Sequence, residues 1–300
     1  MRYFVIRTEN LSKDFHRKRA LANLTLEVEP GEVYGVLGPR GAGKTTLLHI
    51  LLNIVRPSSG NVNVLGMDSQ RQSLEIRRQV GYLPQVLEFP AGANGEQILT
   101  RLGKLRGKID WDEVRSLAAR FNFDLTKPSH TYNALDERKL AIIQAFMHRP
   151  DLVLMDEPSK GLDMTTVTEL YRLVAELRSQ GRSVLIASAS LTEMERICDR
   201  VAVLYQGSLV TVERGVQLRT RALRKIEMRF ASNLSPEIVA ALPNLKNVVL
   251  DNNKLFCTVH GDPDALIKAV SQYRILDFIS QQPSLEEVYQ TYYGIPPYAA

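Results

Sequence analysis

The sequence lacks the features that stabilise small secreted folds or anchor a chain in a bilayer. Its two cysteines, Cys198 and Cys257, stand 59 positions apart without metal-ligand spacing, so we expect buried or inert thiols in a reducing compartment. The longest apolar runs, such as Leu152–Met155, have the length of a strand and fall far short of a membrane span. The stretch Tyr3–Ile6 before Arg7 is too short for a signal-peptide core. These absences predict a cytosolic protein that does not itself cross a membrane.

The chain also lacks internal repeats, low-complexity segments and clustered charge. Its 300 residues carry 38 basic and 33 acidic side chains, for a net charge of +5, and 44% of the residues are hydrophobic. Such a chain can bury a sizeable core in one large domain or in a large and a small one. The basic residues are spread along the chain and no run of them is interleaved with aromatics, which favours ordinary surface charge. We therefore expect no nucleic-acid partner.

Strand-like apolar runs alternate with amphipathic helical stretches through the first two thirds of the chain, as in α/β proteins with a largely parallel sheet. The predicted elements are a strand at Val33–Leu37, a helix at Lys44–Val55, a strand at Leu152–Met155, a helix at Met164–Ser179, a strand at Ser183–Ala187 and a helix at Leu191–Cys198. Between about 86 and 149 the pattern is mainly helical. Two amphipathic helices are expected there, one carrying Leu99, Leu102 and Leu105 and one carrying Val114, Leu117, Ala118 and Phe121.

The pattern changes after about Leu218. The predicted elements there are, in order, a strand at Arg224–Phe230, a helix at Pro236–Leu242, a hairpin around Asp251-Asn252-Asn253, a helix at Asp264–Tyr273, a strand at Ile275–Ile279 and a last helix at Leu285–Tyr293. This βαββαβ order is that of a small ferredoxin-like α+β domain. We expect a main domain at 1–217, with its helical subdomain at about 86–149, and an accessory domain at 218–300.

A glycine-rich segment follows the first predicted strand. Gly38-Pro39-Arg40-Gly41-Ala42-Gly43-Lys44-Thr45 fits the pattern G-x-x-x-x-G-K-[ST] in full, and Thr46 follows. The glycines let successive N–H groups point at phosphate oxygens, and the next helix adds its positive N-terminal dipole. We predict that residues 38–46 bind ATP in a P-loop NTPase (RecA-like) core, with Lys44 on the β- and γ-phosphates and Thr45 on Mg²⁺. The strand and helix on either side argue against a chance glycine-rich turn.

The strand-like run Leu152–Met155 ends in Asp156-Glu157. A carboxylate at the end of a buried strand opposite a P-loop holds Mg²⁺ directly or through water, which makes Asp156 a candidate metal ligand. Glu157 is the candidate general base that polarises an attacking water. The motif is weak alone and strong beside the P-loop.

With these motifs the chain resembles the ATP-binding subunits of ABC transporters over essentially its whole length. Phe15 matches the aromatic that stacks on adenine in that family, the alternative being a core aromatic. Gln85, at the end of Val80–Gln85, matches the Q-loop glutamine. The resemblance implies that Gln85 senses Mg²⁺ and the γ-phosphate, as a catalytic and metal-site residue, and hinges a helical subdomain that touches the membrane subunit.

Two further segments carry the resemblance. Ser159–Asp163 matches the family's D-loop, and the tail around Ser284–Tyr289 looks like the C-terminal domains of drug- and antibiotic-exporter ATPases. The flanking frame of Arg138, Lys139, Leu140, Gln144 and Ala145 aligns with the family without a gap.

The family's signature segment, however, is degenerate. Where the family has Leu/Tyr-Ser-x-Gly-Gln or similar, this chain has Tyr132-Asn133-Ala134-Leu135-Asp136. In the family, this segment of one subunit clamps the γ-phosphate bound by the other. Asn133 still offers an amide, but Leu135 is bulky where glycine allows close approach. Asp136 adds a negative charge near a phosphate, a repulsion of ~1 kcal/mol in bulk water and ~4 kcal/mol near a protein surface at about 4 Å.

The switch histidine of the family is also missing. After the predicted strand Ser183–Ala187 the chain continues Ser188-Ala189-Ser190, and its histidines are elsewhere, at His16, His49, His130, His148 and His260. Ala189 has no side-chain donor for the γ-phosphate. Removing one such donor costs on the order of 10²–10³ in rate. The subunit keeps what binding requires and has lost parts of what hydrolysis requires.

These features predict an ATP- and Mg²⁺-binding subunit of an ABC exporter, peripheral on the cytoplasmic face of the cell membrane. Its expected partners are polytopic membrane subunits and a second, different ATP-binding subunit, since a homodimer would lack the signature and the histidine in both sites. Whether this ATPase turns over is open, and the alternative is a regulatory subunit with little or no hydrolysis. A soluble ABC-fold protein acting on ribosomes or DNA is disfavoured, because tandem P-loops and a long coiled-coil insertion are absent.

Overall fold

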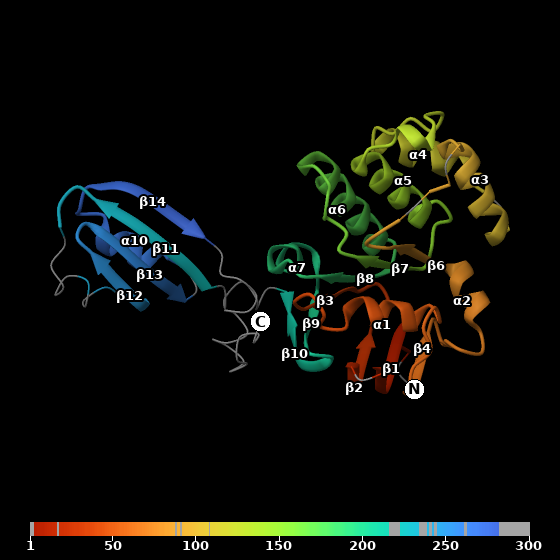
Figure 1. Cartoon of the computed structure of the whole chain (residues 1–300), viewed down its shortest axis with the longest axis horizontal. Coiled ribbons are helices and arrows are strands. Elements are labelled where there is room, and N and C mark those ends of the chain that lie inside the picture. The colour runs from red at the N-terminus through yellow and green to blue at the C-terminus, as the bar shows by residue number, and fades with distance from the viewer. Residues whose placement is uncertain are drawn as a thin grey trace. The chain divides into compact units, whose positions relative to one another are not determined.

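The computed structural model divides the chain into two compact units, Met1–Glu213 and Arg214–Ala300, and each is described by itself. The described residues are 3–16, 18–87, 89–90, 92–107, 109–215, 223–233, 239, 242, 245–260 and 263–281. Figure 1 shows strands and helices alternating in the larger unit and a sheet with a labelled helix in the smaller one. Among the helices so described, none is both long and apolar enough to cross a membrane.

A six-stranded sheet forms the centre of the larger unit. Its order is β10-β9-β3-β8-β7-β6, and the neighbours from β9 to β6 run parallel. Strands β3, β7 and β8 are buried along their whole length, which is why their sequences are continuous apolar runs. The bounds are β3 Val33–Leu37, β6 Val80–Leu83, β7 Leu152–Asp156, β8 Ser183–Ser188, β9 Arg200–Tyr205 and β10 Ser208–Arg214. The predicted α/β fold with a largely parallel sheet is confirmed.

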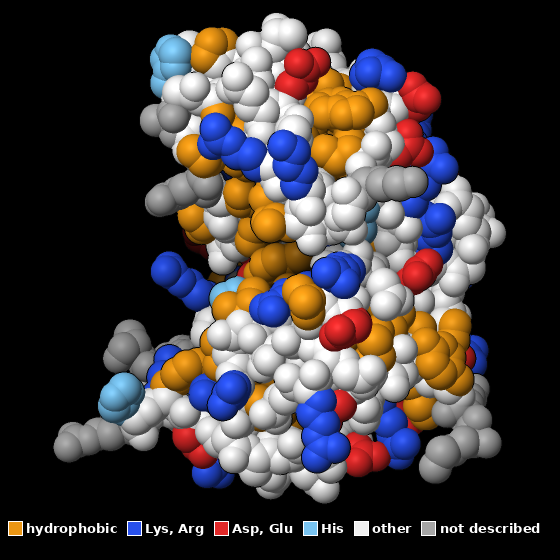
Figure 2. Space-filling view, turned by 90° about the vertical axis from the view of Figure 1, so that its right-hand side faces the viewer, with side chains coloured by type: hydrophobic (Ala, Val, Ile, Leu, Met, Phe, Trp, Pro, Cys, Tyr) orange, Lys and Arg blue, Asp and Glu red, His pale blue; other side chains and the backbone are white. Residues whose placement is uncertain are grey.

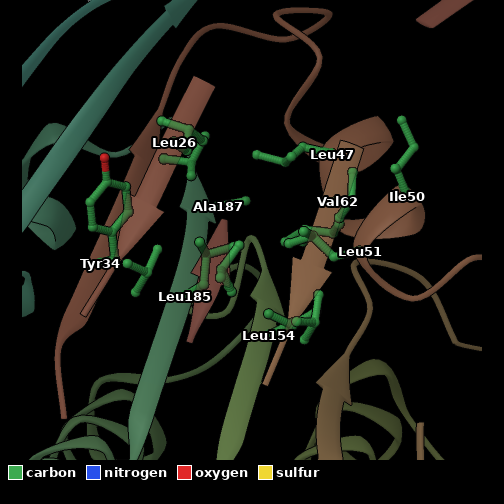
Figure 3. Close-up of a cluster of buried hydrophobic side chains, with 14 of the residues drawn as sticks. Leu26, Tyr34, Leu47, Ile50, Leu51, Val62, Leu154, Leu185 and Ala187 are labelled. Carbon is green, nitrogen blue, oxygen red and sulfur yellow. The ribbon is translucent and has the colours of Figure 1, made fainter. Parts of the chain in front are cut away.

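Helix α1 (Lys44–Leu51) lies between this sheet and a second, antiparallel sheet of order β2-β1-β4-β5. These strands span β1 Ile6–Phe15, β2 Lys18–Val28, β4 Ser59–Val64 and β5 Met67–Asp68. In Figure 3, Leu47 and Leu51 of α1 lie between Val62 of β4 and the side chains of Leu154 and Leu185 in the central sheet. One buried cluster thus joins α1 to both sheets and fixes its N-terminus beside the end of β3.

The helix predicted at Lys44–Val55 is shorter in the structure. It ends at Leu51, and Asn53 adopts a left-handed conformation with φ 51°. On the other side of the central sheet from α1, Figure 1 shows α6 (Met164–Ser179) and α7 (Leu191–Ile197). Both helices contact β8, and α7 also contacts β3.

The remaining helices of the larger unit fall mostly between Gln85 and Arg149, as the mainly helical pattern predicts. They are α2 Ser73–Gln79, α3 Gly95–Arg106, α4 Trp111–Arg120, the short 3₁₀ turn Ser129–Thr131 and α5 Ala134–Phe146. The predicted buried face of α3 is wrong at Leu105, which is 74% exposed while Leu99 is buried. Six residues at about 100° each leave Leu105 about 120° around the helix from Leu99, outside the face that Leu99 buries.

The smaller unit has an antiparallel sheet of order β12-β13-β11-β14, with strands β11 Leu223–Phe230, β12 Leu245–Asp251, β13 Lys254–His260 and β14 Ile275–Gln281. β13 lies between β11 and β12, which is the arrangement of a split β-α-β unit. Alternate residues of β11 and β13 pack with α10 (Asp264–Val270) in one buried cluster. The predicted helix at Pro236–Leu242 lies almost entirely outside the described residues, and the one at Leu285–Tyr293 lies wholly outside them.

Candidate functional site

The glycine-rich segment turns from the end of β3 into α1. Gly41 and Gly43 have φ of 83° and 103°, which L side chains rarely adopt. At Gly43 a Cβ would also collide with the carbonyl oxygen of Ala20 on β2. Glycine is therefore required there both by the backbone angle and by the neighbouring strand. The result is a tight loop at a helix N-terminus, which is an anion-binding geometry.

Lys44, the first residue of α1, reaches back over this loop. It is 6% exposed, and its Nζ donates to the carbonyl oxygens of Gly38 at 2.6 Å and Pro39 at 3.1 Å. The same Nζ lies 3.3 Å from Oε1 of Glu157, the residue directly after β7. The ammonium group thus connects the phosphate-binding loop to the candidate general base.

Thr45 and Asp156 form the second link between the loop and β7. The Thr45 hydroxyl donates to Oδ2 of Asp156 at 2.7 Å, and Asp156 is 1% exposed. Burial raises the pKa of Asp156, although the hydrogen bond from Thr45 opposes this shift. Oδ1 of Asp156 has no hydrogen-bond partner within the described residues. A buried, half-satisfied carboxylate beside a hydroxyl is a donor set that fits Mg²⁺, which binds through few protein oxygens and completes its shell with phosphate and water.

The carboxylate of Glu157 contacts three groups. Its backbone is left-handed, with φ 47°. Oε2 accepts from the backbone N–H of Ala189 at 3.2 Å and from the Ser188 hydroxyl at 3.4 Å, and Oε1 faces Lys44. Position 189 contributes only its backbone to this carboxylate, since alanine has no side-chain donor. The end of β8 therefore positions Glu157 but brings no ring nitrogen to the site.

A cavity of about 600 Å³ unites most of the predicted residues. It is lined by Phe15, Lys18, Ala20, Arg40, Gly41, Ala42, Gly43, Lys44, Thr45, Thr46, Gln85, Glu157, Lys160 and Ala189. Gly38, Pro39 and Asp156 do not line it, because the first two lie beneath Lys44 and Asp156 is buried behind Thr45. Phe15 is 42% exposed at this cavity, so the alternative that it is a core aromatic is wrong. Lys18 and Ala20 were not predicted, since they reach the cavity only through the pairing of β2 with β1.

The signature segment forms the start of α5. Oδ1 of Asn133 accepts from the backbone N–H of Asp136 at 2.8 Å, and Oδ2 of Asp136 accepts from the backbone N–H of Asn133 at 3.2 Å, which is a reciprocal capping box. Lys127 Nζ donates to the same Oδ2 at 2.5 Å. Burial alone would raise the pKa of Asp136, but the hydrogen bonds from Lys127 and Asn133 lower it below its ordinary value. The structure thus gives the expected negative charge of Asp136 a partner, Lys127, that the sequence did not reveal.

Arg138, one turn further along α5, is the functional candidate that sequence patterns missed. It is 7% exposed, and its guanidinium donates to backbone carbonyls after both β6 and β7. In the sequence it was only part of the frame around the signature. No local pattern could have revealed contacts with residues 18 to 54 positions away.

Part of the chain matches a known protein family. Residues 21–160 match the protein family described as ABC transporter. An uncharacterized ABC transporter ATP-binding protein of Methanocaldococcus jannaschii is 33% identical over 68% of this chain and 76% of its own length. The bacitracin transport ATP-binding protein BcrA of Bacillus licheniformis is 30% identical over 69% of this chain and 68% of its own length. 

Solved structures show the same fold. The ATP-binding subunit of an ABC transporter superimposes with a TM-score of 0.66 at 24% identity, over 70% of this chain and 90% of that one. A dimeric ATP-binding cassette in a post-hydrolysis state, bound to ADP and Pi, superimposes with a TM-score of 0.63 at 20% identity, over 70% of this chain and 98% of that one.

Proposed function

The chain belongs to the ABC transporter family as an ATP-binding subunit, and from this membership we propose that it powers an exporter together with a different ATP-binding subunit. The observation that carries the proposal is the convergence of the P-loop, Gln85 and Glu157 on one cavity, with Asp156 directly behind Thr45. The bacitracin-transport and the daunorubicin/doxorubicin-resistance relatives support the exporter class.

ATP and Mg²⁺ are the proposed ligands of the cavity. The N–H groups of residues 40–46 would bind the phosphates, and Phe15 would stack on the adenine ring. Lys44 now bonds two loop carbonyls, which a nucleotide phosphate would replace as its partner. Thr45, Asp156 and Gln85 would hold Mg²⁺, which neutralises phosphate charge when bound. The chain's own task is to orient the phosphates against Glu157.

Hydrolysis is where we propose that a second subunit is needed. Glu157 is positioned to take a proton from water as general base. Its own half-site lacks a histidine donor at Ala189. The side-chain oxygen of Asn133 already accepts a hydrogen bond from the backbone N–H of Asp136 at the start of α5. A partner with a complete signature would supply the missing phosphate clamp to this chain's P-loop. The alternative that Ala189 favours is a regulatory subunit that binds ATP without useful turnover.

The proposed membrane partner docks at the side of the unit formed by α2 and α3, at the right in Figure 1. Three large apolar side chains are exposed there or just after β6, at 51% for Leu74, 74% for Leu105 and 76% for Val86. Figure 2 shows hydrophobic side chains in a hollow on this face, bordered by Lys and Arg. Exposed apolar side chains of this kind mark interaction sites. With this partner, we place the chain peripherally at the cytoplasmic face of the membrane.

Purification from native membranes in mild detergent tests this proposal. We expect the chain to bring down at least one polytopic membrane protein and one other ATP-binding subunit. A triple substitution of Leu74, Val86 and Leu105 to serine is expected to release the membrane protein while ATP binding persists. Recovery of the chain alone from unwashed membranes, or from the soluble fraction only, would refute the transporter assignment of this subunit.

A further inference from the structure

Arg138 joins two loops that the proposed function gives separate tasks. Its Nη1 donates to the carbonyl oxygen of Pro84 and, at 3.5 Å, to that of Gln85. Its Nη2 donates to the carbonyl oxygens of Asp156 at 3.1 Å and Glu157 at 2.7 Å. A single planar group on α5 therefore holds the backbone after β6 and the backbone after β7 at a fixed separation.

The contact places a charged group in the interior of the unit. The guanidinium is buried, and burial lowers the pKa of Arg138, while the nearby carboxylates of Asp156, Glu193 and Glu157 oppose that shift. Nε has no hydrogen-bond partner in the described part of the chain. A well-packed hydrophobic side chain would secure α5 without the desolvation cost of a buried cation. The feature that only arginine provides is the rigid fork, which reaches two pairs of acceptors at once.

The two loops lead to different surfaces. After Gln85, the first loop continues into Val86, which is 76% exposed beside the proposed docking face. The second loop begins with Glu157, whose left-handed backbone sets the direction of the proposed catalytic carboxylate. A shift of the first loop on docking must therefore either break the hydrogen bonds of Arg138 or move the Glu157 carbonyl with it.

We propose that Arg138 is a positioning residue that transmits occupation of the docking face to the Glu157 carboxylate. The inference rests on the proposed function, in which a membrane subunit binds beside Val86 and Glu157 acts as general base. Arg138 does not touch nucleotide in this scheme. Its role is to make the rate at Glu157 depend on the state of the loop after β6.

The chain offers a matched control on the same helix. Gln144 of α5 is 9% exposed and donates from Nε2 to the carbonyl oxygen of Tyr82 on β6 at 2.6 Å. It thus ties α5 to β6, the strand that precedes the first loop held by Arg138. Among the described residues, no side-chain hydrogen bond of Gln144 reaches the loop after β7. Gln144→Leu removes a buried hydrogen bond of similar type and leaves the link to Glu157 intact.

The experiment uses the complex purified with its own membrane and ATP-binding subunits in lipid nanodiscs. ATP turnover is measured for this complex and for the two ATP-binding subunits without the membrane subunits, and their ratio is the stimulation. Arg138→Lys keeps the charge but not the fork, and Arg138→Met keeps the aliphatic stem. For both variants we expect Mg-ATP affinity within about threefold of wild type and a stimulation reduced about tenfold, the loss that broken hydrogen bonds to a charged group typically cause.

Gln144→Leu is expected to retain the wild-type stimulation, even if it lowers thermal stability. Wild-type stimulation in Arg138→Lys would overturn the inference and leave the proposed function standing. An equal reduction of stimulation in Gln144→Leu would also overturn it, because Arg138 would then act only by supporting α5. If the wild-type membrane subunits do not stimulate turnover at all, the proposed function and the inference fall together.

Discussion

The P-loop region and the signature segment at the start of α5 differ in how their polar groups are used. At the P-loop, Lys44 and Thr45 each contact a residue at the end of β7, so the phosphate, metal and general-base groups form one connected set. At the start of α5, the polar groups of Asn133 and Asp136 bond one another and Lys127. The first region is organised toward a ligand and the second toward its own helix. We therefore propose that the chain has the groups needed to bind nucleotide and contributes little to a partner's site.

The largest expected effect is a loss of ATP turnover, without a matching loss of ATP affinity, when Glu157 is substituted. Glu157→Gln keeps the shape and an oxygen that can accept from Ala189 N–H, but it removes the base. In the complex we expect turnover at this half-site to fall by about 10²–10⁴-fold, the usual contribution of a general base. ATP affinity, measured by titration calorimetry, should stay within a few-fold. Unchanged turnover in the complex would show that this half-site is regulatory.

The next effect concerns Lys44. Lys44→Ala removes the only side chain that connects the loop carbonyls to Glu157 among the described contacts. We expect ATP affinity in calorimetry to fall by more than about a hundredfold, or ~2.8 kcal/mol, because a charge-assisted contact to phosphate is lost. Lys18→Ala, at an exposed position lining the same cavity, is the control and should change affinity only slightly. Equal ATP affinities for Lys44→Ala and wild type would contradict the assignment of this loop as the phosphate-binding site.

A smaller effect is expected at the adenine end of the cavity. Phe15→Ala should weaken ATP binding about 2- to 10-fold, because aromatic stacking contributes roughly 0.5–1.5 kcal/mol. Phe15→Tyr should restore it. Inorganic triphosphate, which has no base, should bind the wild type and Phe15→Ala equally. If the triphosphate loses affinity as well, Phe15 supports the loop and does not recognise adenine.

The smallest expected effect is on the free energy of unfolding, and it tests whether the signature segment stabilises the start of α5. Asp136→Asn keeps an acceptor for the Asn133 N–H but removes the charge that pairs with Lys127, so we expect a loss of about 0.2–1 kcal/mol in the free energy of unfolding. Because the pKa of Asp136 is lowered in the folded state, this difference should be present at neutral pH and vanish as the pH falls through that pKa. The fluorescence of Trp111 on α4, which contacts α5, reports unfolding near this site. A difference independent of pH would exclude the ion pair as its cause.

The sequence predicts the P-loop end of the site better than the α5 end, and the reason is distance along the chain. Residues 38–46 bring their backbone groups together within one turn, so spacing alone indicates the geometry. Asp156 ends a buried strand and Glu157 follows it, and parallel strands in one sheet place their ends at the same edge. These local rules also predict the α/β fold.

Contacts that depend on tertiary packing could not be predicted in this way. The pairing of Asp136 with Lys127 depends on the path of the chain before α5, so the sequence indicated the negative charge of Asp136 but not its partner. Arg138 donates to carbonyl groups that follow two separate strands, and backbone acceptors carry no signal in the side-chain pattern. The exposure of Leu105 is a different case, because its position about 120° around α3 from Leu99 could have been inferred from the sequence.

The asymmetry between the two regions is tested most directly by the ATP turnover of the purified chain with and without its second ATP-binding subunit. Alone, the chain should turn over ATP far below the enzymatic median of about 10 s⁻¹. Turnover should rise when a partner with a Ser-x-Gly type signature is added, or when Ala189→His is combined with Asn133→Ser, Ala134→Gly and Leu135→Gly. An ordinary rate for the isolated wild-type chain, abolished by Glu157→Gln, would contradict the account. The Ser188 hydroxyl and Asn133 would then be sufficient donors, and a homodimer would be the functional form.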